Sequence, residues 1–137
     1  MQHSFNIAII AILVVLLSTV VHSDVVHTIP RCHPPPIGIR PVMPFLTVTQ
    51  PTGTYAVGSK LSISWKGFLI MNNPRLSIEL WHGSEYIESY PGKVYFKDSS
   101  KTWRAPLTAR ANYSIKIFAI SNRCIRGESA LFSIISR

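Results

Sequence analysis

The segment from Lys60 to Lys66 alternates strictly, with apolar Leu61, Ile63 and Trp65 interleaved with polar residues. A period of two residues is typical of a β-strand that buries one face. Similar short runs occupy 46–49, 75–82, 86–90, 93–97, 101–106, 112–120 and 130–136, with Gly, Pro, Asn and Ser between them. No window shows the 3.6-residue period of an amphipathic helix. The pattern predicts an all-β fold, an immunoglobulin/fibronectin-III-like antiparallel β-sandwich of about seven strands.

The large aromatic residues of these runs predict the core. If Leu61 and Ile63 face inward, Trp65 fills the space between two sheets, and burial of such a ring contributes about 3 kcal/mol or more. We expect Trp103 to be sealed in the same core. Tyr113, at the start of the longest strand candidate, fits the structural tyrosine corner of such sandwiches.

The N-terminal region is predicted to lie outside this domain. Residues 1–23 hold an uncharged apolar run, 7–21, which is shorter than the ~20 residues of a membrane span and has the length of a signal-peptide core. We expect a signal peptide cleaved after Ser23, with an uncleaved anchor as the alternative. Residues 24–45 contain six of the ten prolines and predict an extended arm. The sandwich domain is expected to span 46–137.

The two cysteines, Cys32 and Cys124, predict one disulfide if the chain enters an oxidising compartment. The bridge would close a long loop and contribute roughly 4–5 kcal/mol in the chain-entropy model. Two unpaired thiols are the competing interpretation. In an immunoglobulin-like topology the first strand runs beside the last in parallel, so the arm would reach the loop expected at 121–127.

The formal net charge is +8, from 14 Lys and Arg against 6 Asp and Glu. A basic secreted protein is attracted to polyanions such as acidic polysaccharides or lipid headgroups. The basic residues are scattered singly, without a stripe or a nucleic-acid-binding motif, so nucleic acid is not an expected partner. The alternative is ordinary surface charge that keeps the protein soluble.

Several segments together resemble one family. They are 46–51 (LTVTQP), 55–59 (YAVGS), 61–65 (LSISW), 76–80 (LSIEL), 103–106 (WRAP), 112–117 (NYSIKI) and 129–134 (SALFSI). This order is similar to the immunoglobulin-like N-terminal domain of the fungal yeast cell-wall synthesis (β-1,6-glucan) proteins, which also occurs in Ser/Thr-rich GPI-anchored membrane proteins. The resemblance implies a secreted or wall-associated protein and brings no catalytic residues. The sequence ends after the last strand candidate, so a GPI anchor is not expected.

The outward side of two strands predicts a candidate binding face. If Leu76, Ile78 and Leu80 point inward, Glu79 and Trp81 point outward, and the neighbouring 112–120 strand adds further side chains. The expected face gathers Trp81, Phe118, Glu79 and Lys116. An exposed aromatic beside polar groups would stack on a sugar ring, whereas clustered apolar groups otherwise mark a protein interface. Cover by the arm, through Ile39, Val42 and Phe45, is the third interpretation.

Catalytic and metal sites are not expected. The carboxylates that would supply a glycosidase pair are Glu79, Glu85, Glu88 and Asp98. They lie on a strand face or in loops of a small sandwich, which favours surface solvation. Cys32 lies beside His33, with His27 nearby and His82 at a strand end, but without the spacing of a metal site. No cofactor is predicted. The triplet 112–114 (NYS) predicts N-glycosylation at Asn112.

The predicted function is a secreted, non-catalytic module that binds cell-wall or extracellular-matrix polysaccharide, with Trp81 and Phe118 as the main contacts. The alternative is a protein-interaction or effector module that uses the same face or the segment 121–127. A hydrolase ranks third. The membrane is expected as a partner only through an uncleaved signal peptide, and the oligomeric state is not predicted.

Overall fold

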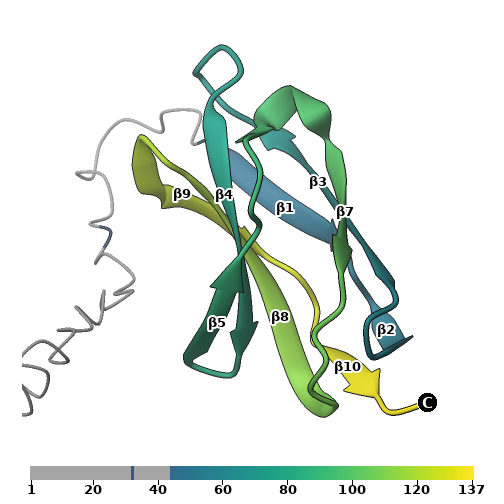
Figure 1. Cartoon of the computed structure of the whole chain (residues 1–137). Helices are drawn as coiled ribbons and strands as arrows, with labels where there is room; N and C mark the ends of the chain where they lie inside the picture. Colours follow the sequence, from purple (N-terminus) through teal and green to yellow (C-terminus); the bar gives the residue numbers. More distant parts are fainter. Residues whose placement is uncertain (1–31, 33–43) are drawn as a thin grey trace, which may run out of the picture.

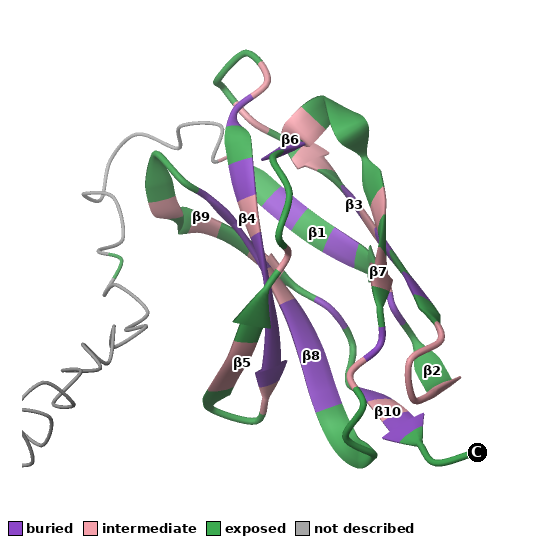
Figure 2. Ribbon diagram, viewed as in Figure 1, coloured by how far each residue is buried: buried purple, intermediate pink, exposed green. Residues whose placement is uncertain are grey.

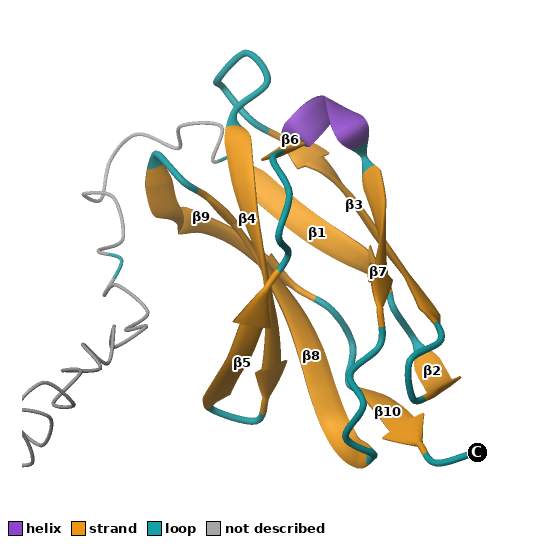
Figure 3. Cartoon of the chain, in the orientation of Figure 1, coloured by secondary structure: helices purple, strands orange, loops and turns teal. Residues whose placement is uncertain are grey.

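The computed structural model describes Cys32 and residues 44–137, and the described chain forms two β-sheets packed face to face (Figure 1). The predicted signal peptide lies outside the described residues. So does the predicted arm, apart from Cys32, Pro44 and Phe45. Figure 3 shows that nearly all regular structure is strand, with one short 3-10 turn. The elements are β1 (Phe45–Gln50), β2 (Gly53–Ala56), β3 (Lys60–Phe68), β4 (Arg75–His82), β5 (Glu85–Ser89), β6 (Val94–Tyr95), η1 (Phe96–Asp98), β7 (Ser100–Arg104), β8 (Arg110–Ala119), β9 (Asn122–Glu128) and β10 (Phe132–Ile135).

The smaller sheet has the strand order β1-β3-β7, and both pairings are antiparallel. Trp65 on β3 lies opposite Val48 on β1, and Leu61 lies opposite Trp103 on β7. Since β3 is the central strand, its apolar residues lie in the middle of the inner face. The strand β7 is left at an open edge.

The larger sheet has the order β2-β10-β8-β4-β5, with β9 also paired to β8 and β6 to β4. The strands β2 and β10 run parallel. The first strand was expected beside the last, but β1 pairs with β3 in the other sheet, and the parallel partner of the last strand is β2. The central pair β4 and β8 is antiparallel over seven residue pairs, from Leu76 opposite Ala119 to His82 opposite Tyr113. Strands β2 and β5 lie at the two ends of this order.

The alternation read from the sequence corresponds to burial between the sheets (Figure 2). On β3, Leu61, Ile63 and Trp65 are all buried in the core, and the Trp65 indole N–H donates a 3.0 Å hydrogen bond to the carbonyl of Phe96. Tyr113 is buried as well, and its hydroxyl donates to the Thr108 carbonyl at 3.0 Å, five residues upstream. This contact is the tyrosine corner expected from the sequence. The fold is an immunoglobulin/fibronectin-III-like β-sandwich.

The segment 121–127 differs from the prediction, because most of it is strand rather than loop. Asn122–Glu128 forms β9, which pairs with β8 as the second arm of a hairpin. Gly127 allows this arrangement: a Cβ at this position would lie 2.5 Å from the Leu46 carbonyl oxygen, so a larger residue would separate β9 from β1. The alternation from Asn122 to Glu128 is largely polar, which hid the strand from the apolar-run criterion.

Candidate functional site

The predicted face on β4 and β8 is assembled as expected from the strand register. Glu79 lies directly opposite Lys116, Trp81 opposite Ser114, and Phe118 opposite Ser77. Trp81 and Phe118 are both absent from the core between the sheets, so they belong to the outer side of the larger sheet. The sequence therefore predicted correctly which residues gather on this side.

Their expected exposure is wrong. Trp81 is 4% exposed and Phe118 is fully buried. The guanidinium of Arg123, on β9, lies 4.2 Å from the centre of the Phe118 ring, and the Lys116 ammonium lies 4.3 Å from the centre of the Trp81 ring. Both contacts are cation–π geometries. The charged groups of Lys116 and Arg123 thus lie over the two aromatic rings and cover them from solvent.

Glu79 holds this outer layer together. Its side chain is 1% exposed, and one carboxylate oxygen accepts a 2.8 Å hydrogen bond from Arg123 while the other accepts the Trp81 indole N–H at 3.1 Å. A buried carboxylate needs such partners, because an unpaired charge away from water is strongly destabilising. We name Glu79, Trp81, Lys116, Phe118 and Arg123 the outer cluster. The structure gives Glu79 the role of a structural anchor in this cluster.

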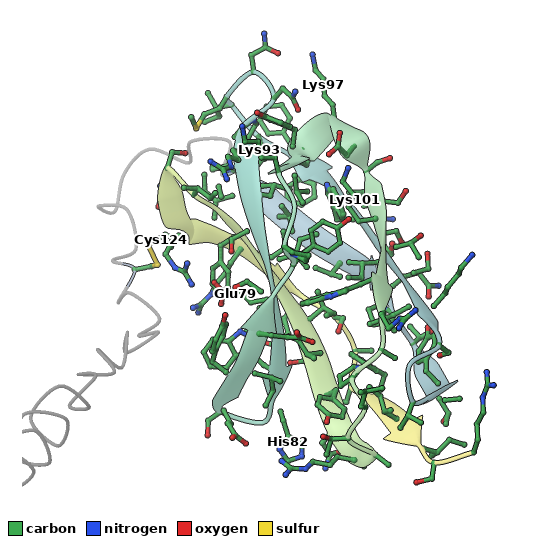
Figure 4. The ribbon with its side chains drawn as sticks, viewed as in Figure 1. Glu79, His82, Lys93, Lys97, Lys101 and Cys124 are labelled. Atoms are coloured by element: carbon green, nitrogen blue, oxygen red, sulfur yellow. A yellow bond between two sulfur atoms is a disulfide. The ribbon has the colours of Figure 1, made fainter. Side chains whose placement is uncertain are left out.

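The disulfide joins Cys32 to Cys124, beside Arg123 in β9, with 5.5 Å between the Cα atoms (Figure 4). This confirms the predicted pairing, and no described cysteine is free. The bridge attaches the N-terminal region to the strand that covers the outer cluster. Disulfides of this kind are typical of proteins in oxidising compartments.

Trp103 also differs from the prediction, because it is only partly buried and packs against the border of the core. It lines a cleft of about 390 Å³ together with Ile87, Glu88, Arg104, Pro106 and Leu107. The Tyr90 ring meets it edge to face at 5.7 Å between centroids, which fixes the orientation of the indole. The cause of its partial exposure is topological: β7 is an edge strand, so no further strand covers that side.

Polar groups in this cleft are available to a ligand. Among the described residues, the Trp103 indole N–H has no protein acceptor, and neither Glu88 nor Arg104 takes part in an ion pair. Glu88 and Arg104 are both exposed, one on each side of the opening between β5 and β7. We name Ile87, Glu88, Trp103, Arg104, Pro106 and Leu107 the edge cleft. Sequence reasoning missed it because alternation indicates the side of a sheet and not the position of a strand within it.

A second cavity of about 230 Å³ lies beside the outer cluster and is lined by Lys116, Arg126, Gly127 and Glu128. Glu128 accepts a 2.8 Å hydrogen bond from the Ser114 hydroxyl and lies 3.8 Å from the Lys116 ammonium. The carboxylate of Glu128 is therefore already bonded to neighbouring protein groups. We do not assign this cavity a ligand separate from the outer cluster.

Two ionisable groups in the described part of the chain have shifted pKa values. Hydrogen bonds from the Tyr95 backbone N–H and from Lys101 lower the pKa of Asp98 below its ordinary value of 3.8. Burial raises the pKa of Tyr113, with a smaller opposing effect from Arg110. Asp98 is therefore charged and Tyr113 neutral around pH 7, and each of them serves a structural contact.

The structure describes some of the remaining predicted sites. Asn112 is exposed and has a positive φ of 63°, while Ser114 of the same triplet is buried, and glycosylation stays a prediction. In the described part of the chain, no three His, Cys, Asp or Glu side chains are grouped for a metal ion. His27 and His33 lie outside the described residues. Within the same part, no helix is long and apolar enough to cross a membrane.

No protein-family model and no curated protein matches the sequence. Among solved structures, the fibronectin(III)-like modules of Clostridium thermocellum CbhA are similar, with 18% sequence identity and a TM-score of 0.38. The match covers 67% of this chain and 94% of the solved chain. The fold assignment above depends on the strand order and register of this chain, and the distant likeness adds nothing about ligand or activity.

Proposed function

We propose that the chain is a secreted, non-catalytic module that binds extracellular polysaccharide at the edge cleft. The observation that carries the proposal is the half-buried Trp103 indole beside two charged groups, Glu88 and Arg104, that form no ion pair with any described residue. An aromatic ring offers an apolar surface to the C–H face of a sugar ring. The carboxylate and guanidinium supply an acceptor and donors for its hydroxyl groups. A cleft of about 390 Å³ also falls in the ~300–1,000 Å³ range of ordinary small-ligand pockets.

Two further observations support an extracellular role. The Cys32–Cys124 disulfide suits an oxidising compartment, and the apolar run 7–21 suits a signal peptide. The net charge of +8 favours retention on acidic wall or matrix polymers. The resemblance to the β-1,6-glucan synthesis proteins makes a fungal cell-wall glucan the specific ligand that we propose.

The outer cluster is not part of this proposal. Trp81 and Phe118 lie beneath Lys116 and Arg123, so stacking on a sugar ring there would first require breaking the Glu79–Arg123 contact. A protein partner at the β4–β8 face would likewise meet Lys116 and Arg123 rather than the two aromatic rings. We keep the predicted stacking of a sugar ring on an aromatic side chain, and we assign it to Trp103 instead of Trp81 and Phe118.

Retention on insoluble β-glucan and on chitin tests the proposal. We expect the wild-type protein to be retained, and both Glu88→Gln and Arg104→Gln to weaken retention about three- to ten-fold, as the loss of one to two hydrogen bonds predicts. Trp103→Ala is expected to abolish it. Tyr95→Ala is a matched control, because Tyr95 is an exposed aromatic residue outside the cleft.

Two outcomes would contradict the proposal. One is the absence of wild-type retention on either polymer. The other is equal retention by wild type and all three cleft variants, since binding would then depend on another surface. Because Trp103 also contacts the core, circular dichroism and thermal melting accompany each variant, and the two charge variants keep the test valid if Trp103→Ala loses its fold.

A further inference from the structure

One end of the sandwich exposes large apolar side chains on loops and strand ends. Ile70, in the β3–β4 loop, is 73% exposed, and Ile120, between β8 and β9, is 48% exposed. Exposed apolar groups that stand singly need no explanation, whereas a group of them marks an interaction surface. We name the whole group the apolar end; its members are Phe45, Phe68, Ile70, Met71, Tyr95 and Ile120.

Backbone pairing and loop contacts bring these residues to the same end. Phe45 and Phe68 lie opposite each other where β1 meets β3. The Ile120 N–H donates to the Arg75 carbonyl at 3.0 Å, and Tyr95 lies opposite Arg75 across β6 and β4. The Ser121 hydroxyl lies 3.3 Å from the sulfur of Met71, so the β3–β4 loop and the β8–β9 turn contact each other.

Basic residues surround the apolar end. Lys66, Arg75, Lys93 and Lys97 are all exposed, and none of them takes part in an ion pair within the described chain. The nearby acidic group is Asp98, which is bound to Lys101 at 2.9 Å and to the Tyr95 backbone N–H. The end therefore presents apolar side chains within a ring of net positive charge. Figure 4 shows Lys97 projecting beyond the strands at this end, with Lys93 lying closer to the strands.

We propose that the apolar end binds the surface of an anionic lipid bilayer. The shape favours a bilayer over a folded protein partner, because the β3–β4 loop, which carries the exposed Ile70 and Met71, protrudes from the end of the sandwich (Figure 1). A protruding loop with apolar side chains enters the headgroup region without a complementary pocket, whereas a protein partner would have to supply one. The four lysine and arginine side chains would then lie at headgroup depth, opposite phosphate and carboxylate charges.

Two exposed aromatic residues near the protruding β3–β4 loop agree with this orientation. Tyr95 and Phe68 are partly exposed near the strand ends, where they would reach the interfacial layer favoured by aromatic rings. The proposed contact is peripheral and electrostatic in part, so it is independent of any membrane-spanning segment. It also uses a different surface from the edge cleft, so one protein would be able to hold a lipid surface and a polysaccharide together.

Co-sedimentation with vesicles tests the proposal on the full secreted protein. The probes are phosphatidylcholine vesicles with and without about 30 mol % phosphatidylserine, at low and at physiological salt. We expect binding to the anionic vesicles, weakened by salt, and little binding to neutral ones. The Ile70→Ser/Ile120→Ser variant is expected to bind at least about ten-fold more weakly, and Arg75→Gln and Lys97→Gln about five-fold more weakly each.

A matched control replaces two exposed aliphatic residues by serine at a site outside the apolar end. Leu131→Ser/Ile135→Ser replaces two aliphatic residues that are 61% and 52% exposed near the other end of the domain, and it should bind vesicles like wild type. All variants share the same N-terminal segment, so a difference between them comes from the substituted surface. Equal binding by the patch variant and wild type would overturn the proposal. Absence of wild-type binding would overturn it too, and would leave the apolar end to a protein partner.

Discussion

The outer cluster and the edge cleft each contain one tryptophan, and the two differ in how the surrounding strands cover them. Trp81 lies on the interior strand β4, between β8 and β5, where Lys116 covers its ring, and it is 4% exposed. Trp103 lies on the edge strand β7, points toward the core, and is nevertheless partly open to a cleft. The comparison shows that position within the sheet decides the availability of an aromatic ring as much as the face on which it lies.

Truncating the two tryptophans should give the largest contrast in stability. Trp81→Ala removes a buried ring together with its hydrogen bond to Glu79, and we expect the free energy of unfolding to fall by about 3–5 kcal/mol. Trp103→Ala should cost about half as much, because part of that ring is already in contact with water. Urea unfolding of the two variants measures the difference, and equal losses would show that the two rings are covered alike.

Removing one arginine from each region gives the next largest contrast. Arg123→Met leaves the carboxylate of Glu79 without its charged partner, and we expect a loss of about 2–3 kcal/mol, below the full penalty for a buried pair since Arg123 is partly exposed. Arg104→Met should change stability by no more than about 0.5 kcal/mol, because the exposed Arg104 side chain forms no ion pair with a described residue. A loss at Arg104 as large as that at Arg123 would contradict the structural role given to the outer cluster.

The smallest effect concerns Asp98, an exposed counterpart to the buried Glu79. Its pKa is lowered by the Tyr95 backbone N–H and by Lys101, so its contribution to stability is complete above its unfolded value of 3.8 and is lost as the pH falls through the folded pKa. The stability difference between wild type and Asp98→Asn should therefore be small at neutral pH and shrink further below about pH 3.8. Thermal melting of both proteins at pH values from about 2 to about 7 measures this stability difference. A difference that grows in acid would contradict the assignment.

The alternation of apolar and polar residues was sufficient to predict the sandwich, the burial of Trp65 and the shared side of Glu79, Trp81, Lys116 and Phe118, once the usual topology of a sandwich placed their two strands side by side. These features depend on the side of a strand, and a period of two specifies that side. The cover of the outer cluster was not predictable in the same way, because Arg123 reaches Phe118 from β9, whose sequence is largely polar. The edge cleft was missed for a related reason: strand order is a property of the whole topology, and the local sequence around Trp103 does not contain it.

The three indole N–H groups of the protein permit one direct test of the binding site, because each gives a separate signal in a ¹⁵N–¹H correlation spectrum. Trp65 donates to the Phe96 carbonyl and Trp81 to Glu79, whereas Trp103 lines the edge cleft. On titration with soluble β-glucan oligosaccharides, we expect the Trp103 signal to shift while the other two keep their positions. A shift of the Trp81 signal alone, or no shift of any indole signal, would contradict binding at the edge cleft.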